Sequence, residues 1–203
     1  PSGMAGAFTT YTYTRTGGGG TLALLTPTSV EMLPDVYVDS NPLAPTYGPE
    51  KCVDGSVNSL QNACSTMPGI HEKSFNFYMS TTQITKVVVH TGTTQDNFAA
   101  HLGAHTVDYT TDGGTTWTTC PGTCSWRNPS GPQYGSTSHD CSAGNGYTGT
   151  PATAYAIYEH PCPVAGVNGV RVINTYGVFR VGEVQPYGMV PDYPQLLWGY
   201  GED

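Results

Sequence analysis

The chain has 203 residues, enough for one domain of about 150 residues with extensions at its ends. Only 11% of the residues are charged and the net charge is −8 with no basic run, so nucleic acid and anionic membranes are poor partners and cations such as calcium are favoured. No apolar stretch approaches the ~20 residues of a membrane-spanning helix.

Residues 1–33 are expected to form an N-terminal extension. Thr–Tyr alternation over residues 9–14 indicates a strand, and the glycines at 17–20 indicate a flexible break. The compact domain is expected over residues 34–190, and an aromatic C-terminal tail over residues 191–203. Two interpretations of the extension and tail stay open: they pack back on their own domain, or they dock on another subunit.

Short, β-branched apolar runs alternate with turn residues through the domain, and no segment of 12 or more residues has a helical period. The runs lie at residues 36–38, 84–90, 154–158, 170–173 and 178–181. Many short strands bounded by turns predict an all-β sandwich or barrel.

The cysteines are the next informative feature. They are Cys52, Cys64, Cys120, Cys124, Cys141 and Cys162. An even number in a charge-poor, Gly-rich chain favours disulfides and an extracellular or cell-surface location. The sequence alone leaves the connectivity open. Cys120 and Cys124 are separated by three residues rather than the two of a zinc or redox pair, so neither chemistry is expected.

Three stretches in a fixed order carry a family resemblance: residues 51–56 (KCVDGS), 107–117 (VDYTTDGGTTW) and 170–188. Together they resemble the galactose-binding-like jelly roll of the discoidin or coagulation-factor type C domains, the related carbohydrate-binding modules and the F-type fucose lectins. The resemblance implies an all-β jelly-roll β-sandwich with N- and C-terminal extensions, and a binding module rather than an enzyme.

Residues 110–117 fit the Asp-box pattern, in which an Asp side chain bonds backbone N–H groups and glycines supply positive φ. Sialidases repeat this motif on propeller blades, but here it occurs once, which argues against a propeller. The discoidin-like domains carry a similar hairpin. We therefore expect a structural turn covered by Trp117.

In F-type lectins the segment that resembles residues 51–56 wraps a calcium ion, which a late Glu completes. The resemblance thus implies calcium as a structural cofactor. The implied ligands are Lys51, Asp54, Ser56, Ser65 and Glu183, with Thr66 as the alternative to Ser65. Loop carbonyls, hydroxyls and carboxylates are the oxygens that calcium takes. The alternative is that Asp54 only caps a turn and Glu183 is a surface strand residue.

The fucose lectins place a disulfide-bonded Cys just before the late Glu, whereas this chain has Gly182 there. On that resemblance Cys64 has to pair elsewhere, and Cys52 is the expected partner. Such a bond would brace the loop between them and stabilise the domain by roughly 2–4 kcal/mol.

The sugar site departs further from the fucose lectins, which use one His and two Arg. The comparable stretch here, residues 90–102, contains no Arg, and a neutral imidazole does not reproduce the bidentate fork of Arg. Fucose binding by that mechanism is not expected. The candidate contacts for another glycan are His71, His90, His101, Trp126 and Tyr134. The last two lie in a long insert, residues 119–150, whose aromatic residues either bind ligand or pack within the loop.

His101 and His105 are four residues apart, but the residues between them do not read as a helix, so hydrogen-bonding or surface histidines are favoured over zinc ligands. No catalytic motif is present and no pair of carboxylates stands out, so the chain is not expected to be an enzyme.

Two functional hypotheses follow. The first is a secreted or cell-surface, calcium-stabilised module that binds a glycan or glycoprotein in adhesion. The second is a structural subunit of an extracellular or surface assembly, whose residues 1–33 and 191–203 contact copies of itself or other subunits.

Overall fold

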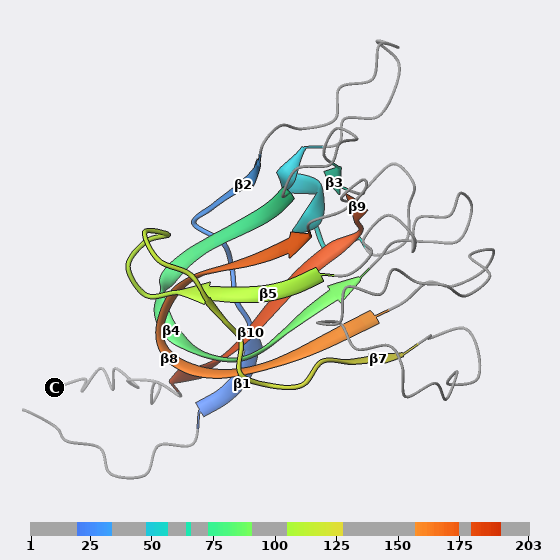
Figure 1. The fold of residues 1–203 in the computed structure, drawn as a ribbon. Helices are drawn as coiled ribbons and strands as arrows, with labels where there is room; N and C mark the ends of the chain where they lie inside the picture. Colours follow the sequence, from blue (N-terminus) through green and yellow to red (C-terminus); the bar gives the residue numbers. More distant parts are fainter. Residues whose placement is uncertain are drawn as a thin grey trace, which may run out of the picture.

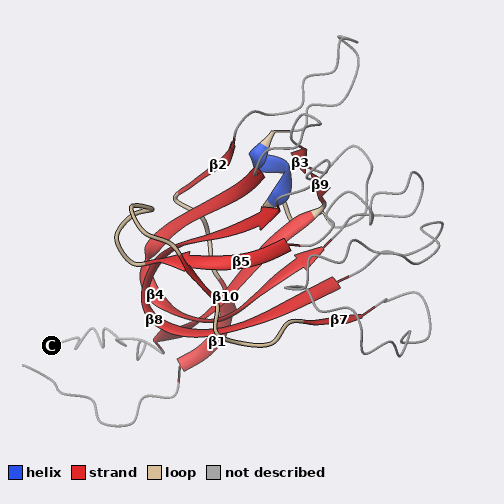
Figure 2. Ribbon diagram, viewed as in Figure 1, coloured by secondary structure: helices blue, strands red, loops and turns tan. Residues whose placement is uncertain are grey.

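In the computed structural model, the described residues are 20–33, 48–56, 64–65, 73–90, 105–127, 157–174 and 180–191. They form antiparallel strands and one short 3-10 helix (Figures 1 and 2). The elements are β1 (Gly20–Leu24), β2 (Ser29–Leu33), η1 (Pro49–Cys52), β3 (Cys64–Ser65), β4 (Lys73–His90), β5 (His105–Thr110), β6 (Thr118–Thr119), β7 (Ser125–Arg127), β8 (Ile157–Asn174), β9 (Arg180–Val181) and β10 (Glu183–Pro191).

Two long strands, β4 and β8, connect the layers of the fold. Each has 18 residues, and they pair antiparallel with register shifts between Tyr78 and Lys86. Gly166 in β8 has a φ of +75°, a conformation that glycine adopts readily. Figure 1 shows both strands curving through this middle region, so that each contributes its two halves to two facing layers.

The first half of β4 pairs with β2 and with the second half of β8, which in turn pairs with β5. The second half of β4 pairs with β10 and with the first half of β8; β1 and β7 complete this layer. The predicted all-β jelly-roll sandwich is confirmed. No helix in the described part of the chain is long and apolar enough to cross a membrane.

The core lies between the two layers. Alternate residues of the long strands point inward, as a half-buried strand requires. The fully buried side chains at the centre are Phe75, Phe77, Val87, Val89, Val107, Val170 and Val172. Burying one such side chain stabilises a fold by roughly 1.5–3 kcal/mol, so each of these strand positions contributes to holding the two layers together.

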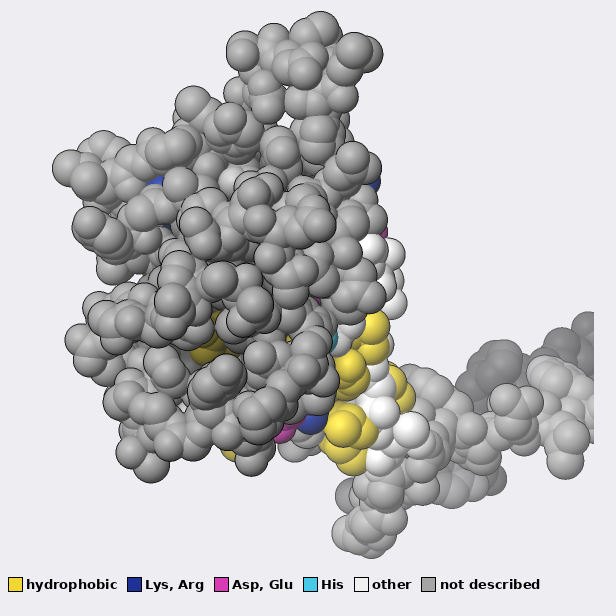
Figure 3. Space-filling view, turned by 90° about the vertical axis from the view of Figure 1, so that its right-hand side faces the viewer, with side chains coloured by type: hydrophobic (Ala, Val, Ile, Leu, Met, Phe, Trp, Pro, Cys, Tyr) yellow, Lys and Arg dark blue, Asp and Glu magenta, His cyan; other side chains and the backbone are white. Residues whose placement is uncertain are grey.

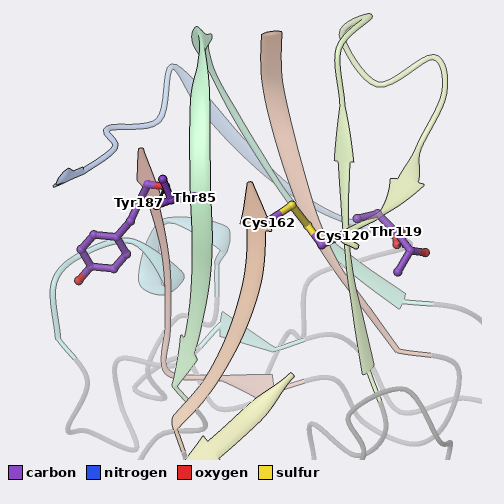
Figure 4. The surroundings of a disulfide bond; sticks show 6 residues. Thr85, Thr119, Cys120, Cys162 and Tyr187 are labelled. Atoms are coloured by element: carbon purple, nitrogen blue, oxygen red, sulfur yellow. Dashed lines mark hydrogen bonds between the residues drawn. A yellow bond between two sulfur atoms is a disulfide. The ribbon is translucent and has the colours of Figure 1, made fainter. Parts of the chain in front are cut away.

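Two disulfides fasten the described elements. Cys120, the residue that follows β6, forms a disulfide with Cys162 of β8 (Figure 4). On the neighbouring β4–β10 pair in the same view, the Thr85 hydroxyl donates to the Tyr187 carbonyl (3.1 Å). The second bond joins Cys52 to Cys64, the pairing expected from the resemblance. Cys124 is also disulfide-bonded, and Cys141 lies outside the described residues.

Residues 20–33 are part of the sheet, although the sequence predicts that they belong to an N-terminal extension. β1 pairs with β10 from Gly20 to Leu24, and β2 pairs with β4. Residues 20–33 therefore pack back on their own domain, which is one of the two interpretations that the sequence leaves open. Residues 1–19 and 192–203, which include the expected strand at 9–14, lie outside the described residues.

Candidate functional site

The segment 48–56 forms a compact turn whose shape follows from its sequence. Pro49 opens η1, where a missing N–H costs nothing, and the Lys51 N–H donates to the Gly48 carbonyl (3.1 Å). The chain then reverses at Gly55, which has a φ of +80°. The Cys52–Cys64 disulfide fixes the turn to β3, so its position relative to the sheet is set covalently.

The fold brings this turn to the start of β10. β3 pairs with β9, and the chain passes from Val181 through Gly182 to Glu183. The Gly55 N–H donates to Glu183 Oε1 (3.2 Å). Asp54 is close enough to Glu183 that the two carboxylates repel each other. The structure thus brings together Asp54 and Glu183, two predicted metal ligands that are 129 positions apart in the chain.

Glu183 is in an unfavourable environment for a lone carboxylate. Its side chain is 2% exposed, and Oε2 has no hydrogen-bond partner among the described residues. Burial raises the pKa of Glu183 to about 7, and the Asp54 charge adds to the increase, while the Gly55 N–H opposes it. The alternative that Glu183 is a surface strand residue is therefore wrong. A buried carboxylate oxygen without a donor calls for a proton or a cation.

Asp54 has two partners in its own turn. The Ser56 N–H donates to Asp54 Oδ1 (2.8 Å), and Lys51 Nζ lies 4.0 Å from Asp54 Oδ2. Turn capping is thus part of the role of Asp54, as the alternative interpretation held. Carboxylates with additional partners remain common calcium ligands, because calcium accepts irregular oxygen shells.

The five predicted ligands stand as follows. Lys51, Asp54 and Ser56 share the turn that contacts Glu183, and Ser65 is buried on β3, one residue after the disulfide. Thr66 lies outside the described residues. Within the described ranges, no three His, Cys, Asp or Glu side chains group as metal ligands, so a cation here requires carbonyl and hydroxyl oxygens beside the two carboxylates. This donor set fits calcium and does not fit zinc.

The predicted sugar contacts are only partly placed. His71, His101 and Tyr134 lie outside the described residues, and Trp126 is on β7, where its side chain is not described. His90, the last residue of β4, is 7% exposed, and its Nε2 lies 3.1 Å from Gln185 Oε1. Its imidazole is thus directed into a contact with β10, and a role in ligand binding stays a prediction.

The strand ends at which two of the predicted ligand-binding segments begin lie close together. Ile157, the first residue of β8, pairs with both His90 of β4 and Arg127 of β7. The segments that carry His101 and Tyr134 therefore leave from neighbouring strand ends. Glu183 also pairs with His90, so the predicted calcium site lies at this same end of the sandwich.

No protein-family model matches this sequence, and no curated protein is similar to it. The structure is similar to that of the CBM32-1 and CBM32-2 domains from Clostridium perfringens ZmpB, with 12% identity and a TM-score of 0.52 over 86% of this chain and 43% of that one. A glycoside hydrolase matches with 10% identity and a TM-score of 0.51 over 87% of this chain and 33% of that one. An F5/8 type C domain from Bacteroides fragilis matches with 16% identity and a TM-score of 0.48 over 79% and 91%.

The fold is that of the galactose-binding-like jelly roll. At these identities the likeness concerns the fold alone, and this chain spans less than half of the first two structures.

The Asp-box hairpin of this galactose-binding-like fold is structural, as the sequence predicts. Asp112 accepts from the Thr110 hydroxyl (2.7 Å) and from the Thr116 N–H (2.9 Å) and hydroxyl (2.7 Å). These bonds lower the pKa of Asp112 to about 2, with those from Thr116 the largest cause. Trp117 lies beneath Arg171, whose guanidinium carbon is 4.9 Å from the ring centroid.

A second cluster, formed by His105 and His160, is not predicted by the sequence. Their Nε2 atoms lie 3.0 Å apart, and both side chains are buried. The spacing in the sequence relates His105 to His101, whereas the partner of His105 in space is His160, 55 positions away. No spacing rule could have found this pair, because it depends on how the two layers face each other.

Proposed function

We propose that this protein is a non-catalytic, calcium-stabilised carbohydrate-binding module acting outside the cell. The observation that carries the proposal is the buried Glu183 oxygen without a hydrogen-bond donor, held beside the turn of Asp54. A structural cation accounts for the exposed Asp54 carboxylate placed beside the buried carboxylate of Glu183. The disulfides support an oxidising, extracellular or cell-surface location.

In this proposal the carboxylates of Asp54 and Glu183 hold the ion, and the carbonyls of Lys51 and Ser56 and the Ser65 hydroxyl complete its shell. The bound ion supplies positive charge, which offsets the repulsion between the two carboxylates. Cys52–Cys64 and the β3–β9 pairing keep the turn in register with Glu183. The protein therefore provides a preformed site that calcium completes.

The pairing of β10 with β4 connects the predicted calcium site to the segments that are candidates for glycan binding. Glu183 pairs with His90, and the segment after His90 contains His101. A cation at Glu183 would thus stabilise the strand ends from which the candidate ligand-binding segments leave. The CBM32 domains with this fold are carbohydrate-binding modules by name, which supports a glycan or glycoprotein as the partner. Adhesion is the role that such binding would serve.

The test combines calcium titration with glycan binding. Calorimetry on the wild-type chain at pH 8 should detect one calcium ion, and Glu183→Gln should abolish the heat. Glu159→Gln is the matched control, because Glu159 is a partly exposed glutamate that pairs with Lys86 away from the turn (2.8 Å). A glycan array probed with calcium and with chelator then tests the ligand. If the wild type binds no calcium, or no glycan is retained on the array, the corresponding half of the proposal fails.

A second candidate function, a structural subunit of a surface assembly, rests on a different observation. Leu22 and Leu24 on β1 are 49% and 50% exposed, and Val190 on the neighbouring strand is 36% exposed. Figure 3 shows exposed hydrophobic side chains gathered on one side of the described residues. Exposed apolar groups on an outer strand of a sheet are typical of contact surfaces.

Light scattering after size exclusion separates the two functions. An assembly subunit should self-associate as the full chain and become monomeric as Leu22→Ser/Leu24→Ser. A chain that is monomeric at all concentrations would exclude self-assembly through β1 and leave the binding module.

A further inference from the structure

His105 and His160 meet across the interior of the sandwich, together with a sulfur atom. His105 begins β5 in one layer, and His160 lies in the half of β8 that belongs to the other layer. Their Nε2 atoms are 3.0 Å apart, and the side chains are 3% and 5% exposed. Cys124 Sγ lies 3.6 Å from His160 Nε2. Three atoms that are common metal ligands thus lie near one another around His160, two of them on buried imidazoles and the third on the half-buried Cys124.

The protonation state of the pair suits metal binding. Two Nε2 atoms at 3.0 Å require that one donates a proton and the other accepts it, so at least one imidazole is neutral. Burial, and then the proximity of His105, lower the pKa of His160 well below its usual range. Neutral imidazole is the form that binds zinc.

The distances agree with those of a zinc site. Zinc binds His nitrogen at about 2.0–2.1 Å and Cys sulfur at about 2.3 Å, so tetrahedral geometry separates two nitrogens by about 3.3 Å and a nitrogen and a sulfur by about 3.6 Å. The observed separations are 3.0 Å and 3.6 Å. These two separations are thus within a few tenths of an ångström of those between ligands around one zinc ion.

The oxidation state of Cys124 decides whether the third ligand is available. Cys124 is disulfide-bonded, and a disulfide sulfur does not supply the thiolate that zinc requires. In this state the described residues contain no group of three metal ligands. Because Cys52–Cys64 and Cys120–Cys162 account for four of the six cysteines, Cys141 is the partner that the chain itself offers.

We propose that His105, His160 and Cys124 form a zinc-binding site when the disulfide at Cys124 is reduced. A thiol or phosphine reductant supplies two electrons; with a phosphine, water provides the oxygen of the phosphine oxide and the protons of the two thiols. Zinc then displaces the proton of the Cys124 thiol. The imidazole that donates through Nε2 moves its proton to Nδ1, so both Nε2 atoms face the ion and the fourth position is left for water or a further ligand.

The experiment uses a variant that exposes the thiol without a reductant. In Cys141→Ser, Cys124 is a free thiol, and Co²⁺ serves as the spectroscopic substitute for zinc. The expected result is one cobalt per chain, with a thiolate-to-cobalt charge-transfer band and the visible bands of tetrahedral cobalt. The matched control is Cys124→Ser/Cys141→Ser, which lacks the same disulfide but has no thiolate, and it should show neither.

Two further variants test the histidines. His105→Ala and His160→Ala, each in the Cys141→Ser background, should weaken zinc binding by more than the roughly 10–100-fold that loss of an outer-shell partner causes. Far-UV circular dichroism establishes that each variant is folded. Unchanged cobalt spectra in both histidine variants would overturn the proposal, because the thiolate would then bind metal with other partners.

The wild-type chain provides a second measurement that is independent of the variants. Its oxidised form should show no thiolate-to-cobalt band, and a phosphine should produce one. If Cys141→Ser does not fold and the reduced wild type shows no band, the proposal is wrong. None of these outcomes depends on the calcium site, since Glu183 and Asp54 are unchanged throughout.

Discussion

Glu183 and His90 occupy directly paired positions on β10 and β4, and the Gly182 N–H donates to the His90 carbonyl (2.8 Å). The pairing connects two features that lie far apart in the sequence. On one side is the buried carboxylate beside the Asp54 turn, and on the other is the strand end that leads into the segment of His101. Changes in the charge of Glu183 should therefore affect both folding stability and the order of this end of the sandwich.

The pKa of Glu183 predicts an unusual pH dependence in the absence of calcium. The pKa rises from 4.5 in the unfolded chain to about 7 in the fold, so between these values the folded protein holds a proton that the unfolded chain has released. The contribution to stability is complete below about pH 4.5 and is lost as the pH rises to 7, by up to about 3 kcal/mol. Urea unfolding with chelator at several pH values measures this, and Glu183→Gln should remove the dependence. A wild-type curve that is the same as that of Glu183→Gln would contradict the prediction.

Calcium should reverse that trend. Above pH 7 the ionised Glu183 becomes a ligand instead of an uncompensated buried charge, so bound calcium should stabilise the fold by about 2.7 kcal/mol at a free concentration of 100 times Kd. At pH 5 the protonated group should bind calcium weakly, and the melting temperature should change little. Melting curves with calcium and with chelator at pH 5 and pH 8 test this. Equal shifts at both pH values would place the ion elsewhere.

His160 should produce the opposite pH dependence. Its pKa lies well below the 6.5 of the unfolded chain, so its contribution to stability is present above pH 6.5 and is lost as the pH falls toward the folded pKa. The slope cannot exceed about 1.4 kcal/mol per pH unit for one proton. Protonation of Glu183 stabilises the fold over the same pH range in which protonation of His160 should destabilise it. The unfolding free energy should therefore be measured against pH in the Glu183→Gln background, where only the His160 effect remains. There, acidification should destabilise the chain, and His160→Gln should flatten the curve.

Sequence reasoning was most successful where the signal is local. The Thr110–Trp117 hairpin follows from residues within one turn, and Asp112 makes the expected bonds. The lengths of β4 and β8 were not predicted, since the short runs at 84–90 and 170–173 are only parts of 18-residue strands that bend midway. Register shifts at the bend interrupt the two-residue period that identifies a strand.

One candidate site was predicted from the sequence and the other was not. The family resemblance led to the Asp54–Glu183 contact and the Cys52–Cys64 bond, which no local pattern specifies. The His105–His160 contact had no such guide, because neither residue belongs to a motif. Contacts between layers depend on the strand order and the bend, and they become visible only once the fold is built.

The two glycines of the Asp-box turn should differ in their tolerance of alanine. Gly113 and Gly114 both have positive φ, +73° and +93°, so either change imposes the backbone cost of about 1–2 kcal/mol. A Cβ at Gly113 would meet nothing within 4 Å, whereas at Gly114 it would lie 2.9 Å from the Tyr78 hydroxyl and 3.5 Å from Trp117. The Tyr78 hydroxyl donates to Glu31 (2.8 Å), so it cannot move without breaking that bond.

Gly114→Ala should therefore destabilise the fold by about 1–3 kcal/mol more than Gly113→Ala, since overpacking adds to the backbone strain. Urea unfolding of the two variants at one pH gives the difference directly. The intrinsic fluorescence of Trp117 should also change only in Gly114→Ala, because only there is the ring contacted. Equal losses of stability in the two variants would mean that Tyr78 and Trp117 move aside freely and do not form a fixed support for the turn.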